Sequence, residues 1–336
     1  MSKLRELASK PLALSCAGFA VLVVLAGARY DGLVSAGVLA NLIEDNAELG
    51  LAALGAMWVL VGGGLDLSIG SVCACAGIGA AKLIVAGGFD PLAAFALVVC
   101  GGAAFGALQG VAIERLALPP FLVTLAGLFI ARAAALSIEL ESLAVSHPTL
   151  AALGDTRVRL GEFSIGPLGL AWLAATLASA FALASSRFGR RVRAVGGNAR
   201  AALHFGLAPA RVRVELYALS GGFAALAGVA HVVYGGSGSA IAASGLELEA
   251  IAAAVVGGTS LAGGLGSALG TALGVALFGF IQTVILFEGT LGAGWTRVAV
   301  GGLFLGFVAL RAGLQRWALR SATADGAATV VPVDPR

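Results

Sequence analysis

Residues 61–71 read Val-Gly-Gly-Gly-Leu-Asp-Leu-Ser-Ile-Gly-Ser and interrupt two long apolar runs with glycines and polar groups. Lipid offers no hydrogen-bond partner, so irregular backbone persists at membrane depth only where protein surrounds it or water enters. The segment therefore predicts a polar hinge inside a packed membrane protein. An ordinary tight turn between two helices is the alternative that these residues alone leave open.

The composition around this hinge is that of an integral membrane protein. Of 336 residues, 59% are hydrophobic and 12% are charged, against roughly 25% charged in a soluble domain. The apolar runs are about 18–23 residues long, which suits helices that cross a hydrocarbon core of about 30 Å, whereas barrel strands alternate over about 10 residues. We predict an all-α, polytopic membrane protein.

Ten apolar runs predict ten transmembrane helices, which return both termini to one side of the membrane. The predicted spans are 11–28, 46–62, 66–86, 91–113, 121–138, 167–185, 214–234, 248–264, 267–287 and 295–311. With the N-terminus inside, the inner segments hold 15 lysines and arginines and the outer segments hold three. By the positive-inside rule, this asymmetry predicts that both termini are cytoplasmic.

Glycine accounts for 50 residues, about twice its usual share of about 7%. Glycines recur every fourth residue at 102–110 and at 266–274, and such stripes let membrane helices approach closely. The hinge also has a weak echo at 256–267, where Val-Gly-Gly is again followed by Gly-Ser. A duplicated helical unit would produce this internal repeat, as in many transporters, and chance matching of glycine-rich sequence is the alternative.

Two segments outside the spans are long enough to bind partners. The inner segment 187–213 holds seven arginines, and its residues 199–205 are predicted to form a short helix that Gly206 and Pro209 end. Topological anchoring explains the arginines but not the helix. The outer segment 139–166 is rich in acidic residues, and a docking site and a solvated loop are equally good interpretations of it.

The sequence lacks the motifs of several other chemistries. The four cysteines lie in apolar runs and the three histidines show no ligand spacing, so neither a metal nor a cofactor is expected. A phosphate loop G-x-x-x-x-G-K-[ST] is absent, so an ATPase would be another polypeptide. An intramembrane hydrolase is disfavoured because the Gly-Gly-Ser-Gly run at 235–238 continues with Ser239 instead of glycine. The basic residues report orientation and do not indicate nucleic-acid binding.

Four motifs, in order along the chain, resemble the ribose, xylose and arabinose importer permeases of bacterial ABC systems. They are Gly-Gly-Leu-Asp-Leu-Ser-Ile-Gly-Ser at 63–71, Pro-Pro-Phe with Thr-Leu at 119–125, Ala-Val-Gly-Gly-Asn at 194–198, and Glu-Leu-Glu-Ala-Ile-Ala with Gly-Gly-Thr-Ser-Leu at 247–261. Within that family, the residues at 45–47, 124–127 with Arg132, 147–148 and 289–296 are most similar to one permease of the galactofuranose importer.

The resemblance implies a permease subunit of an ATP-driven importer that carries a monosaccharide across the bacterial inner membrane, with galactofuranose as the nearest match. It implies three partners besides lipid: a cytosolic ABC ATPase, a second permease (a homologue or a second copy) and a periplasmic sugar-binding protein. The chain itself would be a transport subunit and not an enzyme. We expect one permease domain over 1–320, with a cytoplasmic coupling loop at 187–213 and a disordered cytoplasmic tail at 321–336.

A neutral polyol needs hydroxyl and amide partners along its path, with few full charges. The candidate pathway residues are Asp66, Ser68, Gln109, Thr124, Arg132, Gln282 and Thr283. Asp66 either holds the glycine turn through backbone hydrogen bonds or gates the exit of the sugar. An arginine at a helix centre costs about 2.5–3.5 kcal/mol on insertion, so Arg132 is expected to face the bundle, a partner or water, with snorkelling to the outer interface as the alternative.

The arginine-rich inner segment supplies the candidate coupling residues, which we expect to dock with the following short helix in a groove of the ATPase. They are Arg187, Gly189, Gly196, Gly197, Asn198 and Arg200. An ion-coupled secondary transporter is the alternative function. It would require paired ionisable residues at the membrane midplane, and the span interiors offer essentially Arg132 alone.

Overall fold

The computed structural model of the chain describes residues 11–289 and, beyond them, residues 294, 295, 298, 299, 301, 302, 304–306, 309 and 313. The predicted tenth span and the predicted tail lie largely or wholly outside these residues. The helices are α2 (Pro11–Arg29), α3 (Ala36–Asp45), α4 (Ala47–Val61), α5 (Ile69–Val85), α6 (Pro91–Arg115), α7 (Pro120–Ile138), α8 (Pro148–Asp155), α9 (Pro167–Ser185), α10 (Arg187–Gly197), α11 (Ala199–His204), α12 (Pro209–Gly235), α13 (Leu246–Val256) and α14 (Ala268–Glu288).

The few strands join segments outside the helices. They are β1 (Leu143–Ala144), β2 (Val158–Leu160), β3 (Phe163–Ile165) and β4 (Ser237–Gly238). β2 and β3 form a hairpin before α9, and β1 pairs antiparallel with β4. The second pairing ties the segment after α7 to the segment after α12.

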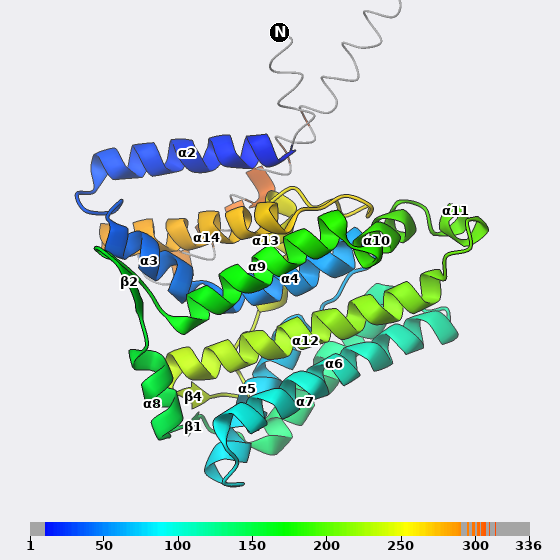
Figure 1. Ribbon diagram of the computed structural model, residues 1–336, viewed down its shortest axis with the longest axis horizontal. Coiled ribbons are helices and arrows are strands. Elements are labelled where there is room, and N and C mark those ends of the chain that lie inside the picture. Colours follow the sequence, from blue (N-terminus) through cyan, green and yellow to red (C-terminus); the bar gives the residue numbers. More distant parts are fainter. Residues whose placement is uncertain are drawn as a thin grey trace, which may run out of the picture.

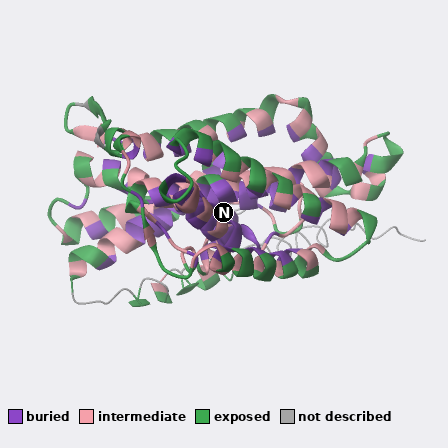
Figure 2. Cartoon of the chain, turned by 90° about the horizontal axis from the view of Figure 1, so that it is seen from below, coloured by how far each residue is buried: buried purple, intermediate pink, exposed green. Residues whose placement is uncertain are grey.

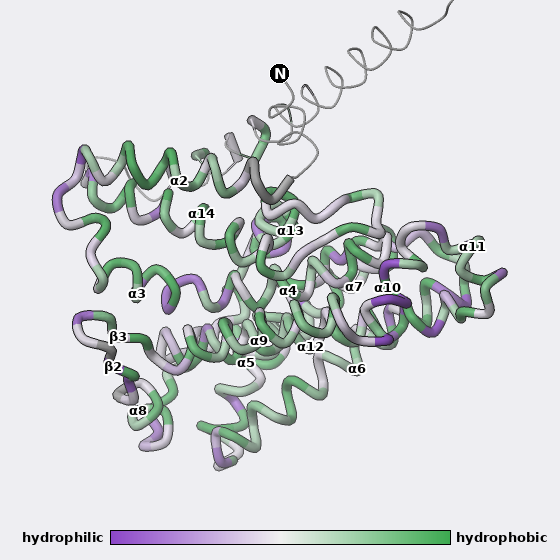
Figure 3. The backbone as a smooth tube through the Cα atoms, turned by 45° about the horizontal axis from the view of Figure 1, so that its top comes forward, coloured by the Kyte–Doolittle hydropathy of each residue, from purple (hydrophilic) through white to green (hydrophobic). Residues whose placement is uncertain are grey.

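Hydrophilic segments gather at two opposite ends of the molecule, with α10 and α11 at one end and α8, β2 and β3 at the other (Figure 3). The helices between them are apolar, and five are long and apolar enough to cross a membrane: α6, α7, α9, α12 and α14. This arrangement confirms the prediction of an all-α, polytopic membrane protein.

Three helices are shorter than the spans predicted for them. The predicted span 248–264 ends as a helix at Val256, and the predicted span from residue 66 becomes helical only at Ile69. At 1.5 Å per residue, α13 is about 16 Å long, roughly half of the hydrocarbon core. α4 is likewise only 15 residues long. The non-helical segments that follow α4 and α13 are partly enclosed by protein, since Asp66, Ser68 and Thr259 are buried, and such enclosure is what irregular backbone at membrane depth requires.

The core of the molecule is built on α4 and α12. Every residue of α4 except Glu48 is buried, which is the property of a helix that is apolar on all sides. α12 packs against α4, α5 and α6, and Figure 1 shows α12 running beside α6, with α2 along the edge of the molecule over α14. Figure 2 shows the buried residues gathered in the centre of the bundle.

The glycine stripe at 102–110 lies where α6 meets α12. A Cβ atom on Gly106 would overlap the carbonyl of Tyr217, and one on Gly102 would overlap the carbonyl of Gly221. The stripe therefore has the packing role predicted for it, because only glycine allows the two backbones to approach so closely.

The two hinges of the predicted internal repeat have the same backbone geometry. After α4, the amide of Gly63 donates to the carbonyl of Leu60 and that of Gly64 to Val59; after α13, residues 258 and 259 repeat this pattern on residues 255 and 254. Gly63 and Gly258 both have positive φ, at 78° and 98°. This is the Schellman ending of a helix, which favours glycine at that position. The hinges also touch, since the amide of Gly264 donates to the carbonyl of Val61.

Candidate functional site

A buried polar network surrounds the hinge after α4. Asp66 is 2% exposed, and its Oδ1 accepts hydrogen bonds from the amide and the hydroxyl of Ser68 at 2.9 and 2.7 Å. Its Oδ2 accepts from the hydroxyl of Ser220 on α12 at 2.7 Å. The carboxylate therefore both holds the turn that begins α5 and fastens that turn to α12.

Two further helices contribute to this network. Gln109 on α6 donates from Nε2 to the Ser68 hydroxyl at 3.0 Å, while its buried Oε1 has no hydrogen-bond partner. Tyr217 on α12 donates to the carbonyl of Leu65 at 3.1 Å, and the hydroxyl of Thr124 on α7 lies 3.4 Å from the same oxygen. Side chains of three helices, α6, α7 and α12, thus meet at one short non-helical segment.

Sequence reasoning found part of this network. Asp66, Ser68, Gln109 and Thr124 were predicted as pathway residues, and the structure brings them together, whereas Ser220 and Tyr217 were missed. Their signal is weak, since a serine and a tyrosine three residues apart on an apolar helix are ordinary packing residues. Only their hydrogen bonds to Leu65 and Asp66 in the structure identify them as partners of the hinge.

A cavity of about 420 Å³ lies against the cytoplasmic side of the hinge in the predicted orientation. Its walls come from the glycines at 62–64, the end of α6, the segment before α7 and the beginning of α12. Glu114 and Arg213 face each other at this cavity, with Oε1 and Nη1 2.6 Å apart. This ion pair links α6 to α12 beside the inner cavity.

A second cavity, of about 400 Å³, lies at the other end of α4. We call it the outer pocket, and it is lined by Asp45, Asn46, Glu48, Leu49, His231, Ile241, Ala243, Ser244, Leu246, Glu249 and Gln282. Along α4 the two cavities are separated by the rise from Leu49 to Val59, which is about 15 Å. The predicted pathway residue Gln282 belongs to the outer pocket.

Two hydrogen-bonded pairs cross the outer pocket from the α3–α4 junction to α12. Glu48 Oε2 lies 2.9 Å from His231 Nδ1, and Tyr234 donates to Asp45 Oδ1 at 2.9 Å. Asp45 lies three residues before Glu48, and Tyr234 lies three residues after His231. Cys73 on α5 also lies 3.7 Å from Glu48, sulfur to Oε1.

Two predicted pathway residues join neither cavity nor the hinge network. Arg132 donates from Nη1 to the carbonyls of Ala240 and Ala242 at 2.6 and 2.8 Å. It faces the protein instead of snorkelling outwards, and it fixes the non-helical segment before α13. The hydroxyl of Thr283 donates to the carbonyl of Gly279 at 2.9 Å, within its own helix.

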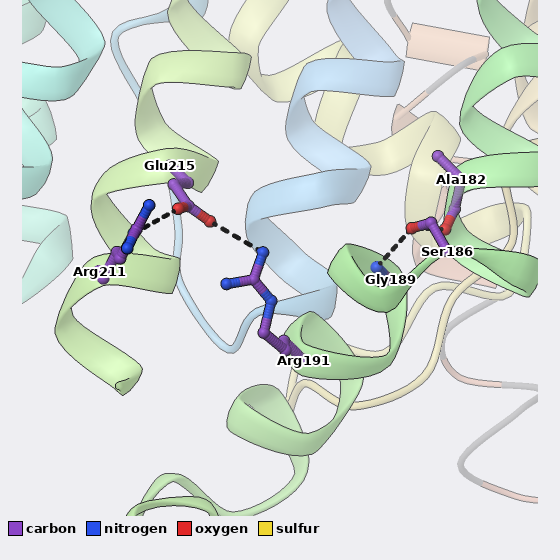
Figure 4. A network of polar contacts seen from close by, with 6 residues as sticks. All are labelled: Ala182, Ser186, Gly189, Arg191, Arg211 and Glu215. Atoms are coloured by element: carbon purple, nitrogen blue, oxygen red, sulfur yellow. Dashed lines mark hydrogen bonds and ion pairs between the residues drawn. The ribbon is translucent and has the colours of Figure 1, made fainter. Parts of the chain in front are cut away.

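The arginine-rich inner segment folds into α10 and α11. The predicted short helix at 199–205 is confirmed by α11, while α10 was not expected. A network of polar contacts joins α10 to α12, because Arg191 lies 3.7 Å from Glu215, which also accepts from Arg211 at 3.0 Å (Figure 4). The hydroxyl of Ser186 caps α10 by accepting from the amide of Gly189 at 3.0 Å.

The predicted coupling residues divide into two groups. Gly189 and Gly196 serve internal packing, since a Cβ atom on either would overlap backbone of a neighbouring segment. The other four lie on the exposed surface of α10, α11 or their junction: Arg187, Gly197, Asn198 and Arg200. Asn198 also caps α11 by accepting from the amide of Ala201 at 2.9 Å.

Cavities with polar lining residues at both ends of a bundle of apolar helices are typical of membrane proteins that conduct solutes. Residues 38–310 match the family described as the permease component of the branched-chain amino acid transport system. The chain belongs to this family.

Relatives named as transport permeases agree with this assignment. The chain is 41% identical over 287 residues to the inner membrane ABC transporter permease protein YjfF of Escherichia coli K12, covering 85% of this chain and 87% of that protein. It is 35% identical over 255 residues to the ribose import permease protein RbsC of Bacillus subtilis 168, covering 74% and 77%. It is 34% identical over 304 residues to the autoinducer 2 import system permease protein LsrC of Enterobacter sp. 638, covering 89% and 84%.

No solved structure matches the chain. The relatives confirm the resemblance to sugar-importer permeases that the four motifs indicated. They also confirm that the chain is a transport component and a multi-pass protein of the inner membrane.

Proposed function

We propose that this chain is one permease subunit of an ATP-driven importer and that it conducts a monosaccharide, with galactofuranose as the candidate sugar. One observation carries the proposal: two cavities with polar lining residues lie at opposite ends of α4 and α12, and Ser220, the partner of Asp66, lies between them along α12. Each cavity falls in the range of about 300–1,000 Å³ that is usual for small-molecule sites.

The polar groups along this route suit a neutral polyol. Hydroxyl, amide and carboxylate groups exchange hydrogen bonds with sugar hydroxyls at small net cost, because each bond lost is replaced by one gained. The hinge network consists of such groups, with serine, threonine, tyrosine and glutamine side chains around one carboxylate.

The partners proposed for the chain fit its two polar ends. Phe205 directly follows α11 and is 86% exposed, and Asn198 and Arg200 at the beginning of the helix are exposed too. An apolar side chain with polar groups nearby suits a groove of a cytosolic ATPase. A periplasmic sugar-binding protein would dock at the opposite end, on residues 139–166. A second permease, either a homologue or a second copy, would complete the pathway.

Uptake by a strain that lacks only this gene tests the transport function. Labelled D-ribose, D-xylose, L-arabinose and D-galactose, whose solutions contain the furanose form, are the probes. Uptake of at least one sugar is expected to disappear and to return with the gene on a plasmid, and to stop when cellular ATP is depleted. Unchanged uptake of every sugar, or sugar concentration by the purified chain alone on an ion gradient, would overturn the proposal.

The docking of α11 is tested on the assembled complex in nanodiscs. Replacement of Asn198 and Arg200 by alanine is expected to reduce sugar-stimulated ATP hydrolysis severalfold. Asn198→Asp keeps the helix cap and separates loss of the cap from loss of the contact. Asp31→Ala, at an exposed position outside both proposed docking segments, is the control. Unchanged stimulation in the double variant would remove this segment from the ATPase interface.

A further inference from the structure

The outer pocket combines polar groups on one wall with apolar side chains on another. Asp45 and Glu48 stand one helical turn apart where α3 meets α4, and Gln282 faces the pocket from α14. Leu49 and Leu246 supply apolar surface. A mixed wall of this kind suits a sugar ring, which presents hydroxyl groups at its edge and C–H groups on its faces.

The carboxylates of Asp45 and Glu48 already have hydrogen-bond partners within the protein. Tyr234 donates to Asp45, and His231 lies within hydrogen-bond distance of Glu48, each at 2.9 Å. Both donors come from the last turns of α12. These bonds keep two carboxylates fixed in position while no solute is bound, and fixed polar groups bind with less loss of conformational entropy.

The spacing of the two pairs defines the chemistry of the ligand. A carboxylate accepts hydrogen bonds and donates none when it is ionised, and it can accept from two hydroxyls at once. Two such groups one turn apart select a solute with several neighbouring hydroxyls. Removing one of those hydroxyls leaves the partly buried Glu48 or the exposed Asp45 without that partner. At Glu48 this loss costs more than the bond itself contributes.

We propose that the outer pocket is a sugar-binding site in which Asp45 and Glu48 recognise neighbouring hydroxyls of a neutral polyol and so set the hydroxyl specificity of the permease. The inference rests on the proposed function and adds the residues that read the substrate. Entry of the sugar exchanges the bonds to Tyr234 and His231 for bonds to sugar hydroxyls. The sugar itself thereby releases α12 from the α3–α4 junction.

A discrimination ratio tests this assignment in cells that contain the whole import system. The probes are labelled D-galactose with its 2-, 3- and 6-deoxy derivatives, and labelled D-ribose with 2-deoxy-D-ribose. The ratio of initial uptake rates, parent sugar over deoxy sugar, is measured for the wild type and for each variant. The binding protein is the same in every strain, so its own preference cancels when the variant ratio is divided by the wild-type ratio.

Glu48→Gln and Asp45→Asn are each expected to lower the ratio for at least one deoxy sugar by roughly fivefold or more, since a hydrogen bond to a charged group is replaced by one to a neutral amide. Glu44→Gln is the matched control. Its carboxylate accepts from the amides of Gly166 and Gly169 at 3.0 and 2.9 Å, so its loss changes stability without changing the ratio.

Tyr234→Phe keeps the assignment testable if the carboxylate variants fail to reach the membrane. It removes one oxygen from a side chain that is 61% exposed, which leaves the fold intact. It is expected to change the ratio of parent-sugar to deoxy-sugar uptake about twofold, because Asp45 no longer accepts a hydrogen bond from the Tyr234 hydroxyl. Wild-type ratios in Tyr234→Phe and in every carboxylate variant that reaches the membrane would overturn the assignment. Failure of the proposed function looks different, because no sugar would then enter wild-type cells through this system.

Discussion

At the scale of the single residue, Asp66 is the side chain on which the hinge depends most. Its two oxygens accept three hydrogen bonds from Ser68 and Ser220, and it is buried. Hydrogen bonds to charged groups contribute about 1.5–3 kcal/mol each. The carboxylate therefore has the first of the two roles foreseen for this residue, because it holds the turn, and it also fastens that turn to α12. Gating of the sugar's exit stays a prediction.

Asp66→Ala is predicted to abolish sugar uptake. The change removes all three bonds and leaves the donors of Ser68 and Ser220 buried without this partner, at a cost of about 1–3 kcal/mol for each donor left unpaired. Asp66→Asn keeps one carbonyl oxygen and is predicted to retain part of the activity. Uptake is measured beside immunoblots of the membrane fraction, with the exposed Asp31→Ala as control. Normal uptake by Asp66→Ala at a normal protein level would remove Asp66 from the pathway.

The sequence could identify the hinge residues but not their partners. Asp66 and Ser68 stand out because polar groups among glycines contrast with apolar spans on both sides. Ser220 lies in a run of small residues that packing alone explains, so nothing marks it as the third partner of the carboxylate. Glu48 and His231 are 183 positions apart, and only the meeting of α4 with α12 turns them into a pair.

At the scale of the element, the contact between α6 and α12 depends on glycine. Gly106→Val is predicted to destabilise the protein by about 1–3 kcal/mol or more, the usual cost of forcing extra atoms into a packed interior. Gly101 offers a matched control on the same helix, because a Cβ there meets no atom within 4 Å. Thermal unfolding in detergent is expected to occur at a lower temperature for Gly106→Val than for Gly101→Val, and equal values would contradict the packing role.

The outer ends of α5 and α7 are joined by an ion pair between Lys82 and Glu139 at 2.8 Å. Hydrogen bonding to Lys82 holds the pKa of the Glu139 carboxyl below its ordinary value. A group with a lowered folded-state pKa stabilises the fold above its unfolded pKa, and that contribution is lost as the pH falls through the folded pKa. Glu139→Gln is predicted to lower thermal stability slightly at neutral pH and to match the wild type once the wild-type carboxyl is protonated, so that stability depends less on pH in the acidic range.

Both side chains of this pair are partly exposed, so the effect is small and weakens with added salt. Glu141→Gln, two residues further on, is the control that keeps the wild-type pH dependence. A pH profile identical to the wild type in Glu139→Gln, measured at low ionic strength, would show that the pair contributes nothing to the outer end of the bundle.

Element boundaries mark the limit of what the sequence could predict. The run 248–264 looks like one span because valine, alanine and glycine all suit a membrane helix. The left-handed conformation of Gly258 ends α13 after Val256, and a glycine pair in an apolar run does not by itself indicate that break. α10 was not predicted, because its arginines would anchor the topology equally well in a loop or in a helix.

At the scale of the whole molecule, the outer pocket and the inner cavity must open in turn if a solute is to cross without a leak. At the inner cavity the Glu114–Arg213 pair ties the end of α6 to the beginning of α12. α12 is also tied to α10 through Glu215 and Arg191. A movement of α10 is thus connected, through the first turns of α12, to the wall of the inner cavity.

Breaking the inner pair is predicted to loosen the closed state of the inner cavity. Glu114→Gln and Arg213→Gln are each expected to raise ATP hydrolysis in the absence of sugar severalfold, because the complex no longer holds α12 against α6. The exchanged pair Glu114→Arg with Arg213→Glu is expected to restore much of the wild-type coupling, since the attraction is regained with the charges reversed.

The matched control for the inner pair is Arg211→Gln, because Arg211 pairs with Glu215 on its own helix and joins no second element to α12. Basal and sugar-stimulated ATP hydrolysis are measured on the same reconstituted complexes. If the single variants keep a low basal rate, or if the exchanged pair is no better than either of them, then the inner cavity is closed by contacts other than this ion pair. A high basal rate that the exchange reverses can arise only from the attraction between these two side chains across α6 and α12.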